Sequence, residues 1–111
     1  MATLSVVAPV YNEEAHLAEF IERCMRAAGA CPADEFEIVL VDDGSVDRSR
    51  EVIREAMRRH PGSVKLLELS RNFGQQAAFH AGLAYARGDV IVTLDSDLQD
   101  PPEVIPRLVE K

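Results

Sequence analysis

Several features that mark other protein classes are missing from this sequence of 111 residues. Its two cysteines, Cys24 and Cys31, fit no metal-binding spacing, and we expect both to be reduced thiols without chemistry. No apolar run approaches the length of a membrane-spanning helix, and residues 1–10 lack the basic start and apolar stretch of a signal peptide. These absences favour a cytoplasmic protein.

Basic residues are few and scattered along the chain. Twelve Lys and Arg stand against nineteen Asp and Glu, which gives a formal charge of −7 and argues against nucleic acid as a partner. An anionic ligand would need a cation between itself and such an acidic chain, and a divalent metal is the usual solution. The composition, 47% hydrophobic and 28% charged, is ordinary for one globular domain with a single core.

Two further absences argue against dinucleotide-binding oxidoreductases and phosphoacceptor receiver domains. The first strand-like run is followed by Tyr-Asn-Glu-Glu rather than by Gly-x-Gly-x-x-Gly, so a dinucleotide-binding oxidoreductase is not indicated. A receiver domain needs a lysine at the end of a late strand. Lys65 lies at the wrong end of its strand, and Lys111 falls in a terminal helical pattern.

Apolar runs alternate with helical patterns along the chain. The runs predict strands over Leu4–Ala8, Phe36–Val41, Val64–Leu69 and Val90–Leu94. Helices are predicted between them and again over Glu103–Glu110, and the alanine-rich helix of residues 75–86 should lie close to a sheet. This order predicts an α/β, Rossmann-like parallel sheet of about four strands with flanking helices. The last pattern is unfinished, so we interpret residues 1–111 as the amino-terminal part of a larger domain.

Unusual polar residues follow each predicted strand. In an open parallel sheet the ligand crevice lies beyond the carboxyl ends of the strands, so these residues are candidates for a binding site. The segments are Pro9-Val10-Tyr11-Asn12-Glu13-Glu14, Asp42-Asp43-Gly44-Ser45, Ser70-Arg71-Asn72-Phe73-Gly74 and Asp95-Ser96-Asp97-Leu98-Gln99-Asp100.

The fourth segment has the donor set of a hard cation. Positions two apart in an extended segment point the same way, so Asp95, Asp97 and Gln99 should present oxygen atoms on one side. Mg²⁺ and Mn²⁺ prefer such ligands and leave positions open for phosphates. The alternative is that these acids cap the following helix, which is the better interpretation of Asp100.

The second segment has two interpretations that the sequence leaves open. Asp42-Asp43-Gly44-Ser45 is typical of a tight turn with a helix cap. Beside the end of the first strand, Asp42 could instead accept a hydrogen bond from a heterocycle, with Tyr11 stacking on the ring. Tyr11 could also be a loop residue without a ligand, and Arg71 either a phosphate clamp or a solvated charge.

Together these motifs resemble a known enzyme family. VVAPVYNEE, VLVDDGSVD and LSRNFGQQAAFHAGLAYARGDVIVTLDSDLQDPPE are similar to the amino-terminal half of a family 2 inverting glycosyltransferase with the GT-A fold. The polyprenyl-phosphate glycosyltransferases, including dolichol-phosphate mannose synthases, are the most similar branch. The resemblance spans Ser5 to Leu108.

The resemblance implies a role for each motif residue. Pro9, Tyr11 and Glu13 would hold the base and ribose, Asp42 would recognise the base with Asp43 and Ser45 in the same loop, and Arg71 and Asn72 would lie near the diphosphate. Asp95 and Asp97, with Gln99 as a third candidate, would bind Mg²⁺ or Mn²⁺, and Asp97 would act in catalysis.

The resemblance also implies partners. The donor would be a UDP or GDP sugar and the acceptor a polyprenyl phosphate, with full-length relatives acting at the cytoplasmic membrane face. A module that binds nucleotide sugars without turnover is the alternative. Val90–Leu94 reads as an interior strand whose later neighbour is absent from residues 1–111. We therefore expect an exposed apolar edge there that favours self-association.

Overall fold

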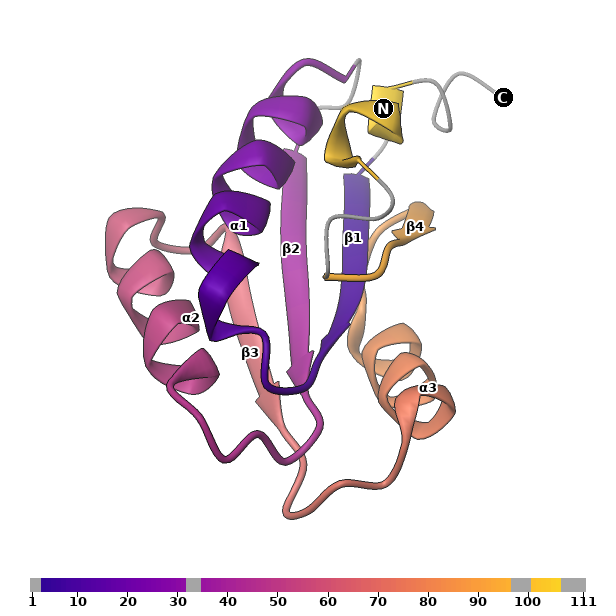
Figure 1. Ribbon diagram of the computed structural model, residues 1–111. Helices are drawn as coiled ribbons and strands as arrows, with labels where there is room; N and C mark the ends of the chain where they lie inside the picture. The colour runs from indigo at the N-terminus through magenta and orange to yellow at the C-terminus, as the bar shows by residue number, and fades with distance from the viewer. Residues whose placement is uncertain (1–2, 32–34, 97–100, 107–111) are drawn as a thin grey trace.

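A four-stranded parallel sheet forms the centre of the protein. The computed structural model describes residues 3–31, 35–96 and 101–106. The strands are β1 (Thr3–Val10), β2 (Glu35–Asp42), β3 (Val64–Glu68) and β4 (Val90–Thr93), in the order β3-β2-β1-β4. All pairs are parallel, so the carboxyl ends of β1, β2 and β3 lie at one end of the sheet (Figure 1). The predicted α/β parallel sheet is confirmed.

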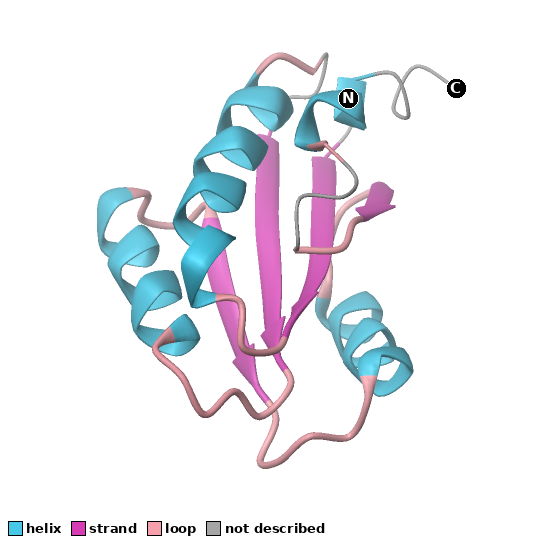
Figure 2. Ribbon diagram, in the orientation of Figure 1, coloured by secondary structure: helices cyan, strands magenta, loops and turns pink. Residues whose placement is uncertain are grey.

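Helices cover both faces of this sheet. They are α1 (Glu14–Gly29), α2 (Ser49–Arg59), α3 (Gln75–Tyr85) and a 3₁₀ turn, η1 (Pro102–Val104). Side chains of α1, α2 and η1 join the core on one face, and α3 packs on the opposite face (Figure 2). The helix predicted over Glu103–Glu110 is described only at its start, because residues 107–111 lie outside the described part of the chain.

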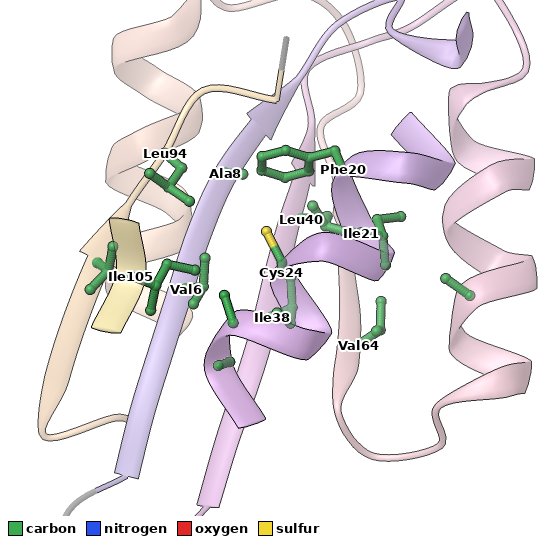
Figure 3. Close-up of a cluster of buried hydrophobic side chains, with 14 of the residues drawn as sticks. Val6, Ala8, Phe20, Ile21, Cys24, Ile38, Leu40, Val64, Leu94 and Ile105 are labelled. Atoms are coloured by element: carbon green, nitrogen blue, oxygen red, sulfur yellow. The ribbon is translucent and has the colours of Figure 1, made fainter. Parts of the chain in front are cut away.

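The larger core lies between β1, β2 and α1. Phe20, Ile21 and Cys24 on one side of α1 pack against alternate strand residues such as Val6 and Ile38 (Figure 3). Burial raises the pKa of the Cys24 thiol to about 12, so it stays protonated at neutral pH. Cys31 is also buried, and neither cysteine forms a disulfide, which agrees with the expectation of two reduced thiols.

Helix α3 packs close to the sheet because the residues that it turns toward the sheet are small. A Cβ atom added to Gly82 would lie 2.4 Å from Val7 Cγ1, closer than carbon atoms can approach. Ala78 is fully buried beside Val39 and Val41. The predicted close approach of this alanine-rich helix is therefore confirmed, and it brings the start of α3 to the carboxyl end of the sheet.

Strand β4 lies at an edge of the described sheet, which agrees with the exposed edge expected at Val90–Leu94. It pairs with β1, and within the described residues no strand pairs with its other side. Val92 is buried on the α1 face, whereas Ile91 is 39% exposed on the other face. None of the helices in the described ranges is long and apolar enough to cross a membrane.

Candidate functional site

A pocket opens at the carboxyl ends of the strands, where the sequence predicted a site. Its volume of about 390 Å³ is in the range of small-molecule sites. Residues from four separate segments line it: Pro9, Val10, Tyr11, Glu13, Asp43, Asn72, Gly74, Gln75, Asp95 and Ser96. Six of the predicted site residues are therefore brought together here, namely Pro9, Tyr11, Glu13, Asp43, Asn72 and Asp95.

Strand alternation separates Asp42 from Asp43. Successive side chains of a strand point to opposite faces, and Leu40 already faces α1. Asp42 therefore faces the same side as α2, where it is 0% exposed and its Oδ2 lies 3.5 Å from Arg50 Nε. Asp42 does not line the pocket, whereas the neighbouring Asp43 does.

Asp43 fixes the loop that precedes α3. Its Oδ1 accepts the Phe73 N–H at 2.8 Å and its Oδ2 accepts the Gly74 N–H at 3.0 Å. The side chain is only 3% exposed, yet it borders the pocket. Each carboxylate oxygen has a second lone pair, so Asp43 can accept a further hydrogen bond from a ligand.

The loop that carries Tyr11 is held by the loop that follows β2. The Asn12 N–H donates to Ser45 Oγ at 2.9 Å, and Asn12 Oδ1 accepts the Val46 N–H at 2.9 Å. Asn12 has φ of 52°, a left-handed conformation that asparagine tolerates better than most residues. This reciprocal pair fixes the backbone beside Tyr11, whose ring is 47% exposed in the pocket lining.

Ser45 has a structural part in this arrangement. Its Oγ accepts the hydrogen bond from the Asn12 N–H, and its own N–H donates to Asp42 Oδ2 at 3.1 Å. Its carbonyl accepts a hydrogen bond from Arg50 Nη2 at 2.8 Å. Ser45 is buried and is not among the residues that line the pocket.

Side chains from the start of α2 also cap α1. The Glu13 N–H donates to Ser49 Oγ at 2.9 Å, and the Glu14 N–H donates to Asp47 Oδ2 at 3.2 Å. Burial raises the pKa of Asp47, but hydrogen bonds from Ser49 and Glu14 outweigh it and hold the pKa below its usual value. Asp47 is thus ionised at neutral pH, which suits its place beside the positive ends of two helices.

Asp95 lines the pocket two residues after the end of β4. Its Oδ1 accepts a short hydrogen bond from Gln75 Nε2. The hydroxyl of the next residue, Ser96, donates to the Pro9 carbonyl at 2.9 Å in a buried contact that joins this loop to β1. Asp97, Gln99 and Asp100 lie outside the described residues, so the predicted ligand set is seen only at Asp95.

The loop after β3 brings Asn72 but not Arg71 to the pocket. Arg71 is exposed and its guanidinium lies 4.9 Å from the centre of the Phe73 ring, a cation–π contact. This loop passes very close to Gly44, where an added Cβ atom would lie 2.5 Å from the Asn72 nitrogen. Gly44 also has φ of 81°, so both its conformation and its lack of a side chain are required.

The described lining of the pocket is acidic. Glu13, Asp43 and Asp95 contribute carboxylates, and none of the described lining residues is Lys, Arg or His. Oxygen donors of this kind fit Mg²⁺ or Mn²⁺. Within residues 3–31, 35–96 and 101–106, however, no three His, Cys, Asp or Glu side chains are close enough to hold one ion. Asp95 is therefore one candidate ligand rather than a complete described site.

Sequence comparison identifies the family. Residues 5–111 match the profile of Glycosyl transferase family 2. The chain belongs to this family. It is 55% identical over 108 residues to the undecaprenyl-phosphate 4-deoxy-4-formamido-L-arabinose transferase of Pseudomonas paraeruginosa and 51% identical over 107 residues to that of Edwardsiella ictaluri. These matches cover 97% and 96% of this chain but 32% and 33% of those proteins, so this family 2 chain spans about a third of their length.

Solved structures with the same fold come from other glycosyltransferases. The mannosyltransferase PcManGT of Pyrobaculum calidifontis, in complex with GDP-Man and Mn²⁺, has a TM-score of 0.76 at 26% identity and covers 98% of this chain and 32% of its own. Glucosyl-3-phosphoglycerate synthase of Mycobacterium tuberculosis, with Mn²⁺, UDP and glucosyl-3-phosphoglycerate, has a TM-score of 0.74 at 27% identity, covering 98% and 39%. TarS of S. aureus in complex with UDP-GlcNAc has a TM-score of 0.73 at 30% identity, covering 86% and 26%. The GT-A-like architecture expected for the family is thus present.

Four of the lining residues received no individual role from the sequence, although three of them lie in the candidate segments that follow the strands and only Gln75 lies outside those segments. Val10, Gly74, Gln75 and Ser96 line the pocket together with the predicted residues. Gln75 could have been found, because a helix that follows a parallel strand begins at the same end of the sheet as the strand ends. The first residue of α3 was therefore a candidate by position.

Proposed function

We propose that this chain binds the nucleotide-sugar donor of an inverting glycosyltransferase that uses a divalent metal and transfers the sugar to a polyprenyl phosphate. The observation that carries the proposal is one pocket that joins Tyr11, Asp43 and Asp95 at the carboxyl ends of three strands. The names of the relatives support the acceptor class, and the complexes of similar structures with GDP-Man, UDP and UDP-GlcNAc support the donor class.

Each pocket residue has a role in this proposal. Tyr11 offers an exposed ring for stacking on the base, and Asp43 accepts a hydrogen bond from a base N–H. Pro9, Glu13 and Asn72 line the same pocket and would surround the ribose and the start of the diphosphate. Arg71, near the rim but not in the lining, would contribute charge from outside. Acceptor attack on the face opposite the leaving nucleotide inverts the anomeric carbon.

Charge explains why a metal belongs to the proposal. A diphosphate is repelled by Glu13, Asp43 and Asp95, and no described lining residue offers a positive charge. Asp95, together with Asp97 and Gln99 from beyond the described residues, would hold Mg²⁺ or Mn²⁺. When bound, such an ion supplies a Lewis acid that stabilises the charge on the departing nucleoside diphosphate.

Calorimetric titration with UDP and GDP, each with and without Mn²⁺, tests donor binding. We expect one nucleotide to bind only with Mn²⁺. In Asp95→Asn, added Mn²⁺ should no longer raise the nucleotide affinity. Asp43→Asn should weaken nucleotide binding about ten- to a hundred-fold, the usual effect of losing a hydrogen bond to a charged group. Asp42→Asn is the matched control: it changes the same charge in the neighbouring residue, outside the pocket.

Two results would contradict this proposal. One is nucleotide binding that is equally strong without Mn²⁺ and in Asp95→Asn. The other is an Asp42→Asn variant that loses nucleotide affinity as much as Asp43→Asn while remaining folded by circular dichroism. Transfer of a radiolabelled sugar to a short polyprenyl phosphate then separates an enzyme from a module that only binds the donor. The cytoplasmic location remains a prediction.

A further inference from the structure

Gln75 faces Asp95 inside the pocket. Its Nε2 donates to Asp95 Oδ1, and both side chains line the cavity. We propose that Gln75 is a positioning residue that holds the Asp95 carboxylate in place for a divalent cation. The inference rests on the proposed function, because it assigns a support to the carboxylate that this function uses.

The main chain at Gln75 is itself fixed. Gln75 is the first residue of α3, and the two preceding N–H groups, of Phe73 and Gly74, are both bound by Asp43. Further along the helix, the absence of a side chain at Gly82 lets α3 rest directly on Val7. A side chain that begins from such a fixed backbone can hold its partner in one position.

The backbone beside Asp95 is fixed from the other side. Ser96 is buried, and its hydroxyl donates to the Pro9 carbonyl at 2.9 Å. The remaining freedom of Asp95 is rotation of its side chain, since the residue before it is also held: the Leu94 N–H donates to the Val7 carbonyl at 3.0 Å. The hydrogen bond from Gln75 restricts this rotation and lowers the entropy lost when a cation binds.

The neutral amide suits this task better than a basic side chain. Lysine or arginine at position 75 would also donate to Asp95, but it would cancel the negative charge that attracts a cation. An amide donates one hydrogen bond and leaves the charge of the carboxylate, and its other lone pairs, in place. Hydrogen-bonded support of this kind is usual behind metal-binding carboxylates.

Gln75→Glu is the variant that tests this arrangement. Glutamate has nearly the same shape but no N–H to donate, and it adds an oxygen that could bind a cation. If Gln75 positions Asp95, the variant weakens Mn²⁺ binding, whereas if Gln75 were itself a ligand, the variant would keep or strengthen it. Gln76→Glu is the matched control, because it makes the same charge change at the next, exposed position of α3.

The measurement is the dissociation constant of Mn²⁺ at saturating UDP, from the electron paramagnetic resonance signal of free Mn²⁺. We expect Gln75→Glu and Gln75→Ala to weaken Mn²⁺ binding about ten- to a hundred-fold, and Gln76→Glu to match the unaltered protein. Circular dichroism and the thermal midpoint should be the same in all four proteins, since Gln75 is exposed.

Three outcomes would overturn this inference alone, and a fourth would overturn the proposed function as well. If Gln75→Glu binds Mn²⁺ as tightly as the unaltered protein or more tightly, Gln75 is either dispensable or itself a ligand. If Gln76→Glu loses as much Mn²⁺ affinity as Gln75→Glu, the cause is the change in overall charge. If the loss of Mn²⁺ affinity comes with a lower thermal midpoint, the cause is reduced stability of the protein. If the unaltered protein itself binds no Mn²⁺ with UDP, the proposed metal-dependent function fails as well.

Discussion

Ser49 Oγ accepts the backbone N–H of Glu13 at 2.9 Å, so the first residue of α2 caps the start of α1. A helix normally receives this bond from a residue of its own chain segment, but Glu13 makes no such side-chain cap. The contact joins residues 36 apart in the sequence and ties the loop of Tyr11 to the loop after β2.

Removal of this cap gives the first prediction. Ser49→Ala should lower the free energy of unfolding by about 1 kcal/mol, because the Glu13 N–H loses its acceptor. Since the loop beside Tyr11 loosens, nucleotide affinity should also fall. Urea unfolding and calorimetric titration measure the two effects. Unfolding that is unchanged from that of the parent protein would mean that the cap contributes nothing to stability.

Gly44 and Gly62 offer a matched pair for the second prediction. Both have left-handed φ, 81° and 84°, but an added Cβ meets the Asn72 backbone at Gly44 and nothing within 4 Å at Gly62. Alanine at either position should cost about 1–2 kcal/mol for the conformation, with a further 1–3 kcal/mol at Gly44 for the clash. Urea unfolding of both variants compares them, and equal losses would contradict the close approach of the two loops.

Glu37 gives the third prediction, on pH. Its buried carboxylate accepts hydrogen bonds from Ser5 Oγ, Lys65 Nζ and the Arg87 N–H. Burial alone would raise the pKa of Glu37, but these donors outweigh it and lower the pKa below the ordinary value. The unfolded chain then binds the proton more readily than the folded one, so the stabilisation is present above the ordinary pKa of about 4.3 and is lost as the pH falls through the folded value.

Glu37→Gln tests this directly. The variant should be less stable than the parent protein at neutral pH, and the difference should shrink as the pH falls below about 4. Urea unfolding of both proteins between pH 3 and pH 7 measures it. A difference that stays constant across this range would assign the effect of Glu37 to packing instead of charge.

The outer edge of β4 gives the fourth prediction. Ile91 is 39% exposed on an edge strand, and Leu83 and Tyr85 at the end of α3 are also exposed. Apolar edges of this kind pair with other chains, so we expect concentration-dependent self-association that Ile91→Lys reduces. Sedimentation velocity measures this, with Val46→Lys in an exposed loop as the control. A parent protein that remains a monomer at high concentration would refute it.

The periodic pattern of apolar residues determined the elements of this fold. The four predicted strands agree with β1 to β4 within two residues at each end. The central strands β1 and β2 are buried on both faces and must be apolar along most of their length, which makes them easy to find. Their alternation with helices also predicted the parallel sheet and the end of it at which the pocket lies. This part of the fold depends on local sequence and on the handedness of chain crossovers, which are the same in all such proteins.

The tertiary structure decided which members of each motif reach the pocket. Asp42 and Asp43 are equal in the sequence, but the strand register turns the first toward Arg50 and the second toward the Gly74 loop. Ser45 read as a site residue or a turn residue, and its contact with Asn12 became clear only when the two loops met. The contact of Gln75 with Asp95 joins residues 20 apart in the sequence. A local sequence pattern cannot predict such a contact, because it depends on how the sheet and α3 pack.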